Sequence, residues 1–208
     1  MTAIDHVIYG TRDLDAAGHR FWEEYGLASY EGGLHPAYGT ANRIVPLGDS
    51  YIELMGISDP TAARMNPLGE FVLSQIDAGD RWIAWCLRPD DINAVADRIG
   101  SVAVPGHRTR PDGTSVTWML AGLEIALTDP PLPFFIAWDD PDHTPGRESL
   151  EHRAGAMGIA EIEIACDAKQ LRHHAGADLP VRIAPGDPGI VAVTLTTERD
   201  PLRIPLRN

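Results

Sequence analysis

The stretch AIDHVIYGTRDLDAAGHRFWEEYG, residues 3–26, decides the fold of this chain. It begins with a short apolar run that contains β-branched residues and ends in glycine, a pattern that predicts a strand. The carboxylate of Asp13 can then cap a helix. Apolar side chains follow at helical spacing from Leu14 to Tyr25, and Gly26 stops the helix. We therefore expect a strand followed directly by an amphipathic helix.

Further strands complete this first unit. A turn-rich stretch at residues 32–36 precedes a strand predicted at 40–47, and another strand is predicted at 51–57. The order reads β-α-β-β-β, and the turn-forming pair Asp59-Pro60 closes the unit.

The same unit then occurs a second time. Its predicted strand at 82–87 precedes a helix that Asp91 caps and Gly100 ends. The match extends to single residues, since the turn pair Gly39-Thr40 recurs as Gly113-Thr114. Chance rarely reproduces element order, capping residue and turn glycines together, so the chain carries an internal repeat. The remaining strands of the second unit are predicted at 101–104, 115–120 and 123–128, the last aligning Leu123-Glu124-Ile125 with Ile52-Glu53-Leu54.

This repeat divides the chain into consecutive parts. They are a first βαβββ module at 1–60, a connector with a short helix at 61–79, a second βαβββ module with an extra edge strand at 80–140, and a linker with a partial third βαββ module at 141–208. One helix covers only one face of each small sheet, so two curved sheets can enclose a cavity. We expect an α+β fold in which the paired modules form a curved, barrel-like mixed sheet around a cleft.

Composition restricts the partners. The formal net charge of −13 disfavours binding to nucleic acid and to anionic membrane surfaces. No apolar run reaches the roughly 18 residues that cross a bilayer, and no secretory signal is recognised, so a cytoplasmic location is expected. No phosphate-binding loop or GxGxxG motif after a strand indicates a nucleotide cofactor. A small-molecule ligand is the expected partner, and a homodimer is a further expectation.

Strand parity predicts what points into the cavity. His6 lies on the strand face opposite Val7, and Glu53 lies on the face opposite Ile52. If Val7 and Ile52 pack under the first helix, His6 and Glu53 both point into the cavity.

An imidazole and a carboxylate in one cavity suggest a divalent metal such as Zn, Fe, Mn or Ni. An ion pair, or a hydrogen-bonded histidine in a polar pocket, explains the same pattern. Glu124, the repeat partner of Glu53, adds a third potential ligand, whereas Ala84, the repeat partner of His6, cannot ligate.

Two motifs resemble a known family. Residues 33–42, GLHPAYGTAN, fit the pattern GxHxxxGTxN, and residues 51–54, YIEL, fit YxEL. With the duplicated βαβββ unit, they resemble the glyoxalase-like branch of the vicinal oxygen chelate superfamily. The resemblance implies a paired-module barrel around a cleft, although several relatives bind a ligand without a metal. It also implies metal ligands from the first and last strands of each module, which at matching positions are His6, Glu53 and Glu124.

The candidate catalytic residues are His35 and Glu53, because an imidazole or a carboxylate can transfer a proton. Each substrate-binding candidate has a structural alternative as well: a turn histidine, a strand amide with a structural hydrogen bond, or an aromatic side chain in the core. These candidates are His35, Asn42, Tyr51, Trp118 and Trp138.

The expected function is that of a metal-dependent lyase or isomerase acting on a small oxygenated molecule. The ion on His6, Glu53 and Glu124 would polarise a substrate oxygen. The alternative is a metal-free protein of the same fold that binds and sequesters a small molecule. The tryptophans and the departure at Ala84 favour this alternative.

Overall fold

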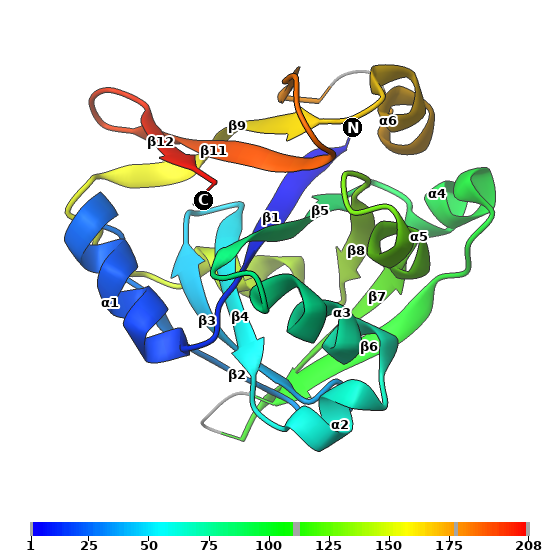
Figure 1. The fold of residues 1–208 in the computed structure, drawn as a ribbon, viewed down its shortest axis with the longest axis horizontal. Coiled ribbons are helices and arrows are strands. Elements are labelled where there is room, and N and C mark those ends of the chain that lie inside the picture. Colours follow the sequence, from blue (N-terminus) through cyan, green and yellow to red (C-terminus); the bar gives the residue numbers. More distant parts are fainter. Residues whose placement is uncertain (1, 110–112, 177–178, 207–208) are drawn as a thin grey trace.

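A computed structural model describes residues 2–109, 113–176 and 179–206. A closed barrel lies at its centre, with eight strands in the order β1-β4-β3-β2-β6-β7-β8-β5, and a second sheet of four strands covers part of the outside (Figure 1). The expected α+β class and barrel-like mixed sheet are confirmed. Among the described residues, no helix is long and apolar enough to cross a membrane.

The first module supplies half of the barrel. The side chain of Asp13 accepts hydrogen bonds from the first amides of its helix, and Gly26 ends that helix with a φ of 66°. The last strand pairs in parallel with the first, which brings the two ends of the module together. The elements are β1 (Ala3–Gly10), α1 (Leu14–Tyr25), β2 (Tyr30–His35), β3 (Thr40–Pro46) and β4 (Tyr51–Ile57).

The turn-rich stretch predicted at 32–36 mostly belongs to a strand. β2 pairs with β3, and Leu34 lies opposite Thr109 of β6, which closes the barrel. Gly32 stands in the strand because its neighbours need the space: a Cβ there would lie 2.2 Å from Asn42 Oδ1. The turn itself follows β2 and contains Gly39, whose φ is 65°.

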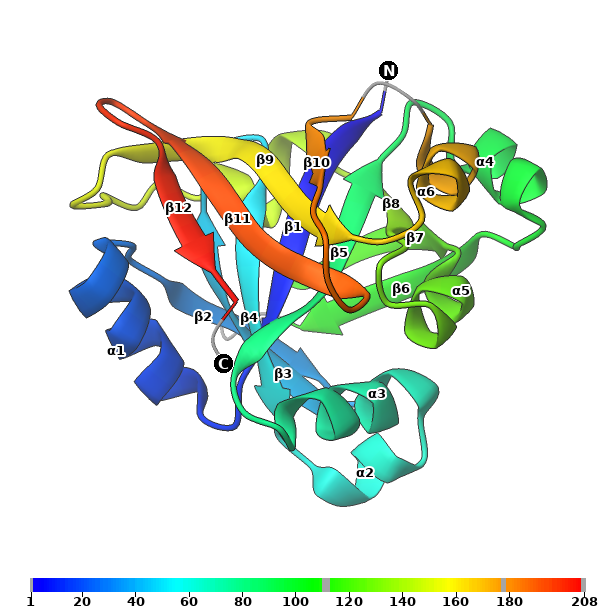
Figure 2. The ribbon, with the colours of Figure 1, turned by 45° about the horizontal axis from the view of Figure 1, so that its top comes forward.

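The connector forms α2 (Pro60–Arg64) and α3 (Pro67–Ile76). α3 corresponds to the helix predicted at 68–76. Both helices lie at the end of the barrel away from the second sheet (Figure 2).

The second module repeats the first with one insertion. Asp91 and Gly100 cap its first helix as expected. β8 pairs in parallel with β5, as β4 does with β1. The elements are β5 (Arg81–Arg88), α4 (Ile92–Ile99), β6 (Val104–Thr109), β7 (Ser115–Ala121), α5 (Leu123–Thr128) and β8 (Phe134–Trp138).

Two strand predictions in this module are wrong. Residues 101–103 lead into β6 without pairing, and residues 123–128 form helix α5. The run at 132–138, expected to be an extra edge strand, contains β8, a barrel strand paired on both sides. A short apolar run fits a buried helix as well as a strand, so periodicity could not separate α5 from β8.

The third module contains more strands than predicted. It comprises β9 (Ala156–Ala165), α6 (Ala168–Ala175), β10 (Val181–Ile183), β11 (Gly189–Thr197) and β12 (Leu202–Pro205). Its element order is therefore β-α-β-β-β, but its strand order β10-β9-β11-β12 differs from that of the barrel modules. Two short 3-10 helices, Pro141–His143 and Pro145–Arg147, lie in the linker before it.

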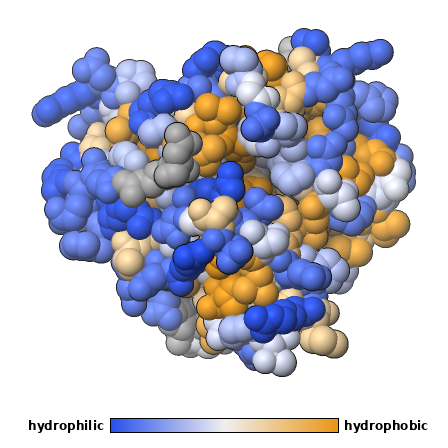
Figure 3. Space-filling view, in the orientation of Figure 1, coloured by the Kyte–Doolittle hydropathy of each residue, from blue (hydrophilic) through white to orange (hydrophobic). Residues whose placement is uncertain are grey.

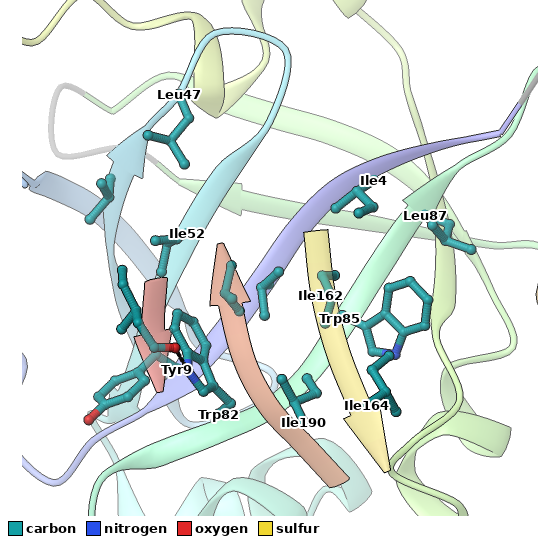
Figure 4. Packing of buried hydrophobic residues seen from close by; sticks show 14 of the residues in the cluster. Ile4, Tyr9, Leu47, Ile52, Trp82, Trp85, Leu87, Ile162, Ile164 and Ile190 are labelled. Atoms are coloured by element: carbon teal, nitrogen blue, oxygen red, sulfur yellow. Dashed lines mark hydrogen bonds between the residues drawn. The ribbon is translucent and has the colours of Figure 1, made fainter. Parts of the chain in front are cut away.

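This second sheet covers the outer face of β1 and β5. Ile162 and Ile164 of β9 and Ile190 of β11 face Trp82 and Trp85 of β5, and all are at most 3% exposed (Figure 4). Trp82 and Trp85 are three residues apart and share the outer face because the pairing of β1 with β5 shifts register between them, which leaves Ile83 and Ala84 to line the barrel interior. On the face of the molecule that Figure 3 shows, most side chains near the edge are hydrophilic, and apolar side chains are exposed near the middle.

Candidate active site inside the barrel

The barrel encloses a cavity of about 770 Å³, including the space at its mouth. Most of the wall is apolar, and helices α3 and α5 contribute Phe71, Val72 and Ala126 to it. A mainly apolar wall with a few polar groups suits small organic ligands. The polar and charged side chains of the wall include His6, His35, Asn42, Tyr51, Glu53 and Arg108.

His6 of β1 and Glu53 of β4 lie close together on adjacent strands in the wall of this cavity. Nε2 of His6 lies 3.7 Å from Oε2 of Glu53, and the side chains are 4% and 8% exposed. The two side chains line the same cavity, as strand parity indicates. A carboxylate beside an imidazole, both shielded from water, can hold and transfer a proton.

A β-bulge places a second carboxylate behind His6. Ile4 pairs with Leu87 and His6 with Cys86 across β5, so Asp5 is an extra residue on β1. Neighbouring side chains of a regular strand point to opposite faces, whereas a bulge re-aims one of them. The carboxylate of Asp5 thereby reaches the ring of its own neighbour.

Asp5 fixes the orientation of that ring. Nδ1 of His6 donates to Asp5 Oδ1 at 2.7 Å. The other oxygen accepts from Arg88 at 3.1 Å and from Nε1 of Trp138 at 2.9 Å. A hydrogen bond at Nδ1 selects the tautomer and leaves Nε2 directed at Glu53. Asp5 therefore acts through His6, while Arg88 offsets its buried charge.

Asn42 forms a hydrogen bond with the other carboxylate oxygen of Glu53. Its Nδ2 donates to Oε1 of Glu53 at 2.5 Å, and its Oδ1 accepts from Arg108 at 3.3 Å. A single amide thus joins the carboxylate of the first module to the guanidinium of the second. The substrate-binding candidate Asn42 lies in the cavity, and its hydrogen bonds give it a positioning role as well.

His35 lies at the end of β2, near the same carboxylate. Its Nδ1 is 3.1 Å from Oγ1 of Thr40, within hydrogen-bonding distance. Burial lowers the pKa of His35 below its usual value; Glu53 opposes this shift, and Arg108 adds to it. A neutral imidazole at this position can accept a proton.

The other substrate-binding candidates also lie on the wall. Tyr51 stacks on the ring of His6, with the centroids 4.6 Å apart, and burial raises its pKa well above the usual value. Trp118 and Trp138 contact each other edge to face at 5.4 Å. All three are lining residues of the cavity. Trp138 also supports Asp5, which gives it a structural part.

Glu124 does not lie in the strand position that the internal repeat predicts. It lies in the first turn of α5, is exposed, and accepts a hydrogen bond from Ser101. The strand that takes the expected position is β8, in which Phe134 pairs with Cys86. Glu124 therefore does not line the cavity that His6 and Glu53 share, and its prediction as a metal ligand was wrong because 123–128 is a helix.

The donor set does not fit a resident divalent metal. A catalytic zinc site uses three protein ligands, and non-haem iron commonly uses two histidines and one carboxylate. Among the described residues, no group of three or more His, Cys, Asp or Glu side chains could hold an ion together. Near His6 in the cavity wall, the second module contributes Ala84 and Phe134, whose side chains have no donor atom.

Sequence reasoning missed two residues of this site. Asp5 precedes His6 directly, and without the bulge its side chain would point away from the cavity. Arg108 reaches Asn42 only because β2 pairs with β6, a contact between modules that no spacing in the sequence encodes. The sequence of β6, VPGHRT, has no apolar run, so no local signal marks Arg108 as buried.

Comparison with known proteins supports the fold. A family model described as "Glyoxalase-like domain" matches residues 4–179. A crystal structure of a hypothetical protein from Staphylococcus aureus is similar with a TM-score of 0.66 and 18% identity, over 99% of this chain and 86% of that chain. No curated protein matches this chain.

Two methylmalonyl-CoA epimerases are similar at 17% identity. The enzyme from Mycobacterium tuberculosis has a TM-score of 0.43 over 65% of this chain and 86% of its own. The enzyme from Streptomyces coelicolor has a TM-score of 0.45 over 66% of this chain and 96% of its own. Because the family model spans most of the chain and both motifs lie within it, the chain belongs to the glyoxalase-like domain family.

Proposed function

We propose that this protein is a lyase or isomerase that moves a proton on a small, oxygenated and largely apolar molecule. The supporting observation is the carboxylate of Glu53, which Asn42 and His6 position in an otherwise mainly apolar cavity. A positioned carboxylate shielded from bulk water is a common general base.

In this proposal Glu53 takes a proton from a carbon next to a carbonyl group. The electrons of the C–H bond form a C=C bond, and negative charge develops on the carbonyl oxygen. The proton then returns at another carbon in an isomerase, or a leaving group departs in a lyase. His6, whose Nε2 is 3.7 Å from Glu53, would exchange the proton with that carboxylate.

The proposal replaces the metal expected from the family resemblance with this pair of side chains. Of the three expected ligands, only His6 and Glu53 line the cavity, and Ala84 and Phe134 of the second module add no donor atom there. The protein is therefore expected to act without Zn, Fe, Mn or Ni. Activity that EDTA abolishes and one of these ions restores would contradict this.

Deuterium exchange tests the proposed proton transfer. The C–H groups next to the carbonyl of phenylpyruvate and of phenylacetaldehyde are followed by proton NMR in D₂O. We expect the wild-type protein to accelerate exchange in at least one of them, and Glu53→Gln to reduce this acceleration by about 100-fold or more. Equal rates with wild type and Glu53→Gln would contradict the role of Glu53.

A metal-free binding protein is the second candidate. The mainly apolar lining and the two tryptophans on the wall favour it, because such walls hold aromatic ligands without chemistry. Tight ligand binding with no exchange in any variant would support this candidate over the enzyme.

A further inference from the structure

Two hydrogen-bond donors on the cavity wall have no acceptor. Nη2 of Arg108 on β6 and Nε1 of Trp118 on β7 are buried and unpaired among the described residues. Both residues line the cavity. Buried polar groups are nearly always paired, so unpaired donors on residues that line a cavity suggest that a ligand supplies the acceptor.

No carboxylate among the described residues is bonded directly to Arg108. The residue is 2% exposed, and its hydrogen bond within the described residues goes to a neutral amide, Oδ1 of Asn42. Asp5 pairs with Arg88, and Glu53 is engaged by Asn42. A buried cation without a directly bonded carboxylate is costly, and an incoming anion would remove that cost.

We infer that the natural ligand is a small organic carboxylate whose anionic group pairs with Arg108 and whose apolar remainder fills the cavity. This deepens the proposed function and rests on it for the chemistry that follows binding. A planar guanidinium matches a carboxylate better than a point charge does. The apolar wall around Trp118 suits an aromatic or branched aliphatic remainder.

Arg108 also lies close to Glu53, the proposed general base. Asn42 contacts Glu53 with one end of its amide and Arg108 with the other, so one side chain separates the anchor from the base. A carboxylate held at Arg108 therefore brings the carbons next to it toward Glu53. Substrates with an acidic C–H close to a carboxylate follow as the class this cavity selects.

Calorimetry with three related probes tests the inference. Phenylacetate, phenylacetamide and phenyl phosphate share an aromatic ring and differ in the head group. We expect the wild-type protein to bind phenylacetate at least about tenfold more tightly than the neutral amide, since a hydrogen bond to a charged group contributes that much. Arg108→Gln should remove this preference, and Arg98→Gln, a change at an exposed arginine of α4, should keep it.

Several outcomes would overturn the inference. Equal affinity for phenylacetate and phenylacetamide, no binding of phenylacetate, or a preference that survives in Arg108→Gln would each do so. Tighter binding of phenyl phosphate would overturn the assignment to a carboxylate. If circular dichroism shows that Arg108→Gln does not fold, Arg108→Lys replaces it. This variant keeps the charge but loses the planar guanidinium, so we expect a weaker preference for phenylacetate. An unchanged preference would contradict the inference.

The binding test and the test of the proposed function can succeed or fail independently. Glu53→Gln should retain the preference for phenylacetate, because binding to Arg108 does not need the base. Preferential binding of phenylacetate without deuterium exchange in either substrate would contradict the enzyme proposal and support the carboxylate site. Exchange in phenylacetaldehyde without preferential binding of phenylacetate would contradict the carboxylate site and support the enzyme proposal.

Discussion

Asp5 accepts hydrogen bonds from His6, Arg88 and Trp138 although it is only 1% exposed. A buried carboxylate with three donors is stable where it stands, and each donor depends on its negative charge. The orientation of His6 follows from this arrangement, because the ring has no other partner at Nδ1 among the contacts described.

Asp5→Asn should therefore destabilise the fold. We expect a loss of about 1–3 kcal/mol in the free energy of unfolding, since hydrogen bonds to a charged group are weakened at a buried site. Asp49→Asn is the matched control, because Asp49 pairs with Arg147 at the surface and is 75% exposed. Urea unfolding measures both, and an equal effect of the two changes would contradict the account.

His35 links stability to pH. Burial lowers its pKa in the folded state, so the unfolded chain binds a proton more readily below its ordinary pKa of about 6.5. Stability contributed by neutral His35 is thus present above that pH and is lost as the pH falls below it. His35→Asn should shrink the difference in unfolding free energy between about pH 7.5 and about pH 5.5. A tenfold difference in proton affinity between the folded and unfolded states corresponds to about 1.4 kcal/mol, which urea unfolding resolves.

The control for this pH dependence is His19→Asn, at an exposed position of α1. It should leave the difference between the two pH values as in the wild type. An unchanged difference in His35→Asn would show that other groups cause the acid loss.

At the scale of elements, the turn after β2 depends on a glycine. Gly39 has a φ of 65°, and a Cβ there would lie 2.4 Å from the amide nitrogen of Ala63 and 2.5 Å from the carbonyl oxygen of Asp59. Those atoms belong to the backbone of α2 and its cap, so they cannot move aside cheaply.

Gly39→Ala should cost more than the repeat-related change Gly113→Ala. Both positions have a positive φ, which costs about 1–2 kcal/mol for alanine, but a Cβ at Gly113 meets no atom of the described residues within 4 Å. The contacts at Gly39 should add about 1–3 kcal/mol. Thermal or urea unfolding of the two variants measures the difference, and equal losses would mean that the turn after β2 adjusts freely.

The same scale shows what the sequence could predict. The helices that follow Asp13 and Asp91 were predictable because capping residues and glycine stops are local signals. The helix α5 was not predictable, since the six residues 123–128 carry no decisive period and only pairing with β5 and β7 selects β8 as the strand. The positions of His6 and Glu53 followed from strand parity, whereas Asp5 required a bulge and Arg108 a contact between modules.

For the whole molecule, the sheet of the third module packs against the outside of the barrel. This sheet buries Trp82 and Trp85, whose side chains would otherwise be exposed on the outer face of β5. The inward face of the same strand forms the wall of the cavity. Docking of this sheet therefore supports the site without contributing a residue to it. The homodimer and the cytoplasmic location expected from the sequence stay predictions.

Ile162→Ala tests this docking. Ile162 is fully buried between the second sheet and the barrel, so we expect a loss of about 2–5 kcal/mol for the cavity it leaves. Ile183→Ala, in the same sheet but 43% exposed, should cost much less. Chemical unfolding compares them. Similar losses at both positions would argue against a packed contact between sheet and barrel.

The central claim is that His6 and Glu53 meet in one cavity while Glu124 lies outside it. The most direct test records the ring signals of ¹⁵N-labelled histidine by NMR in the wild type, Glu53→Gln and Glu124→Gln. We predict that Glu53→Gln shifts the signals of His6 and His35 and leaves those of His152 and His174, whereas Glu124→Gln shifts neither His6 nor His35. Unchanged His6 signals in Glu53→Gln, or shifted ones in Glu124→Gln, would contradict the account.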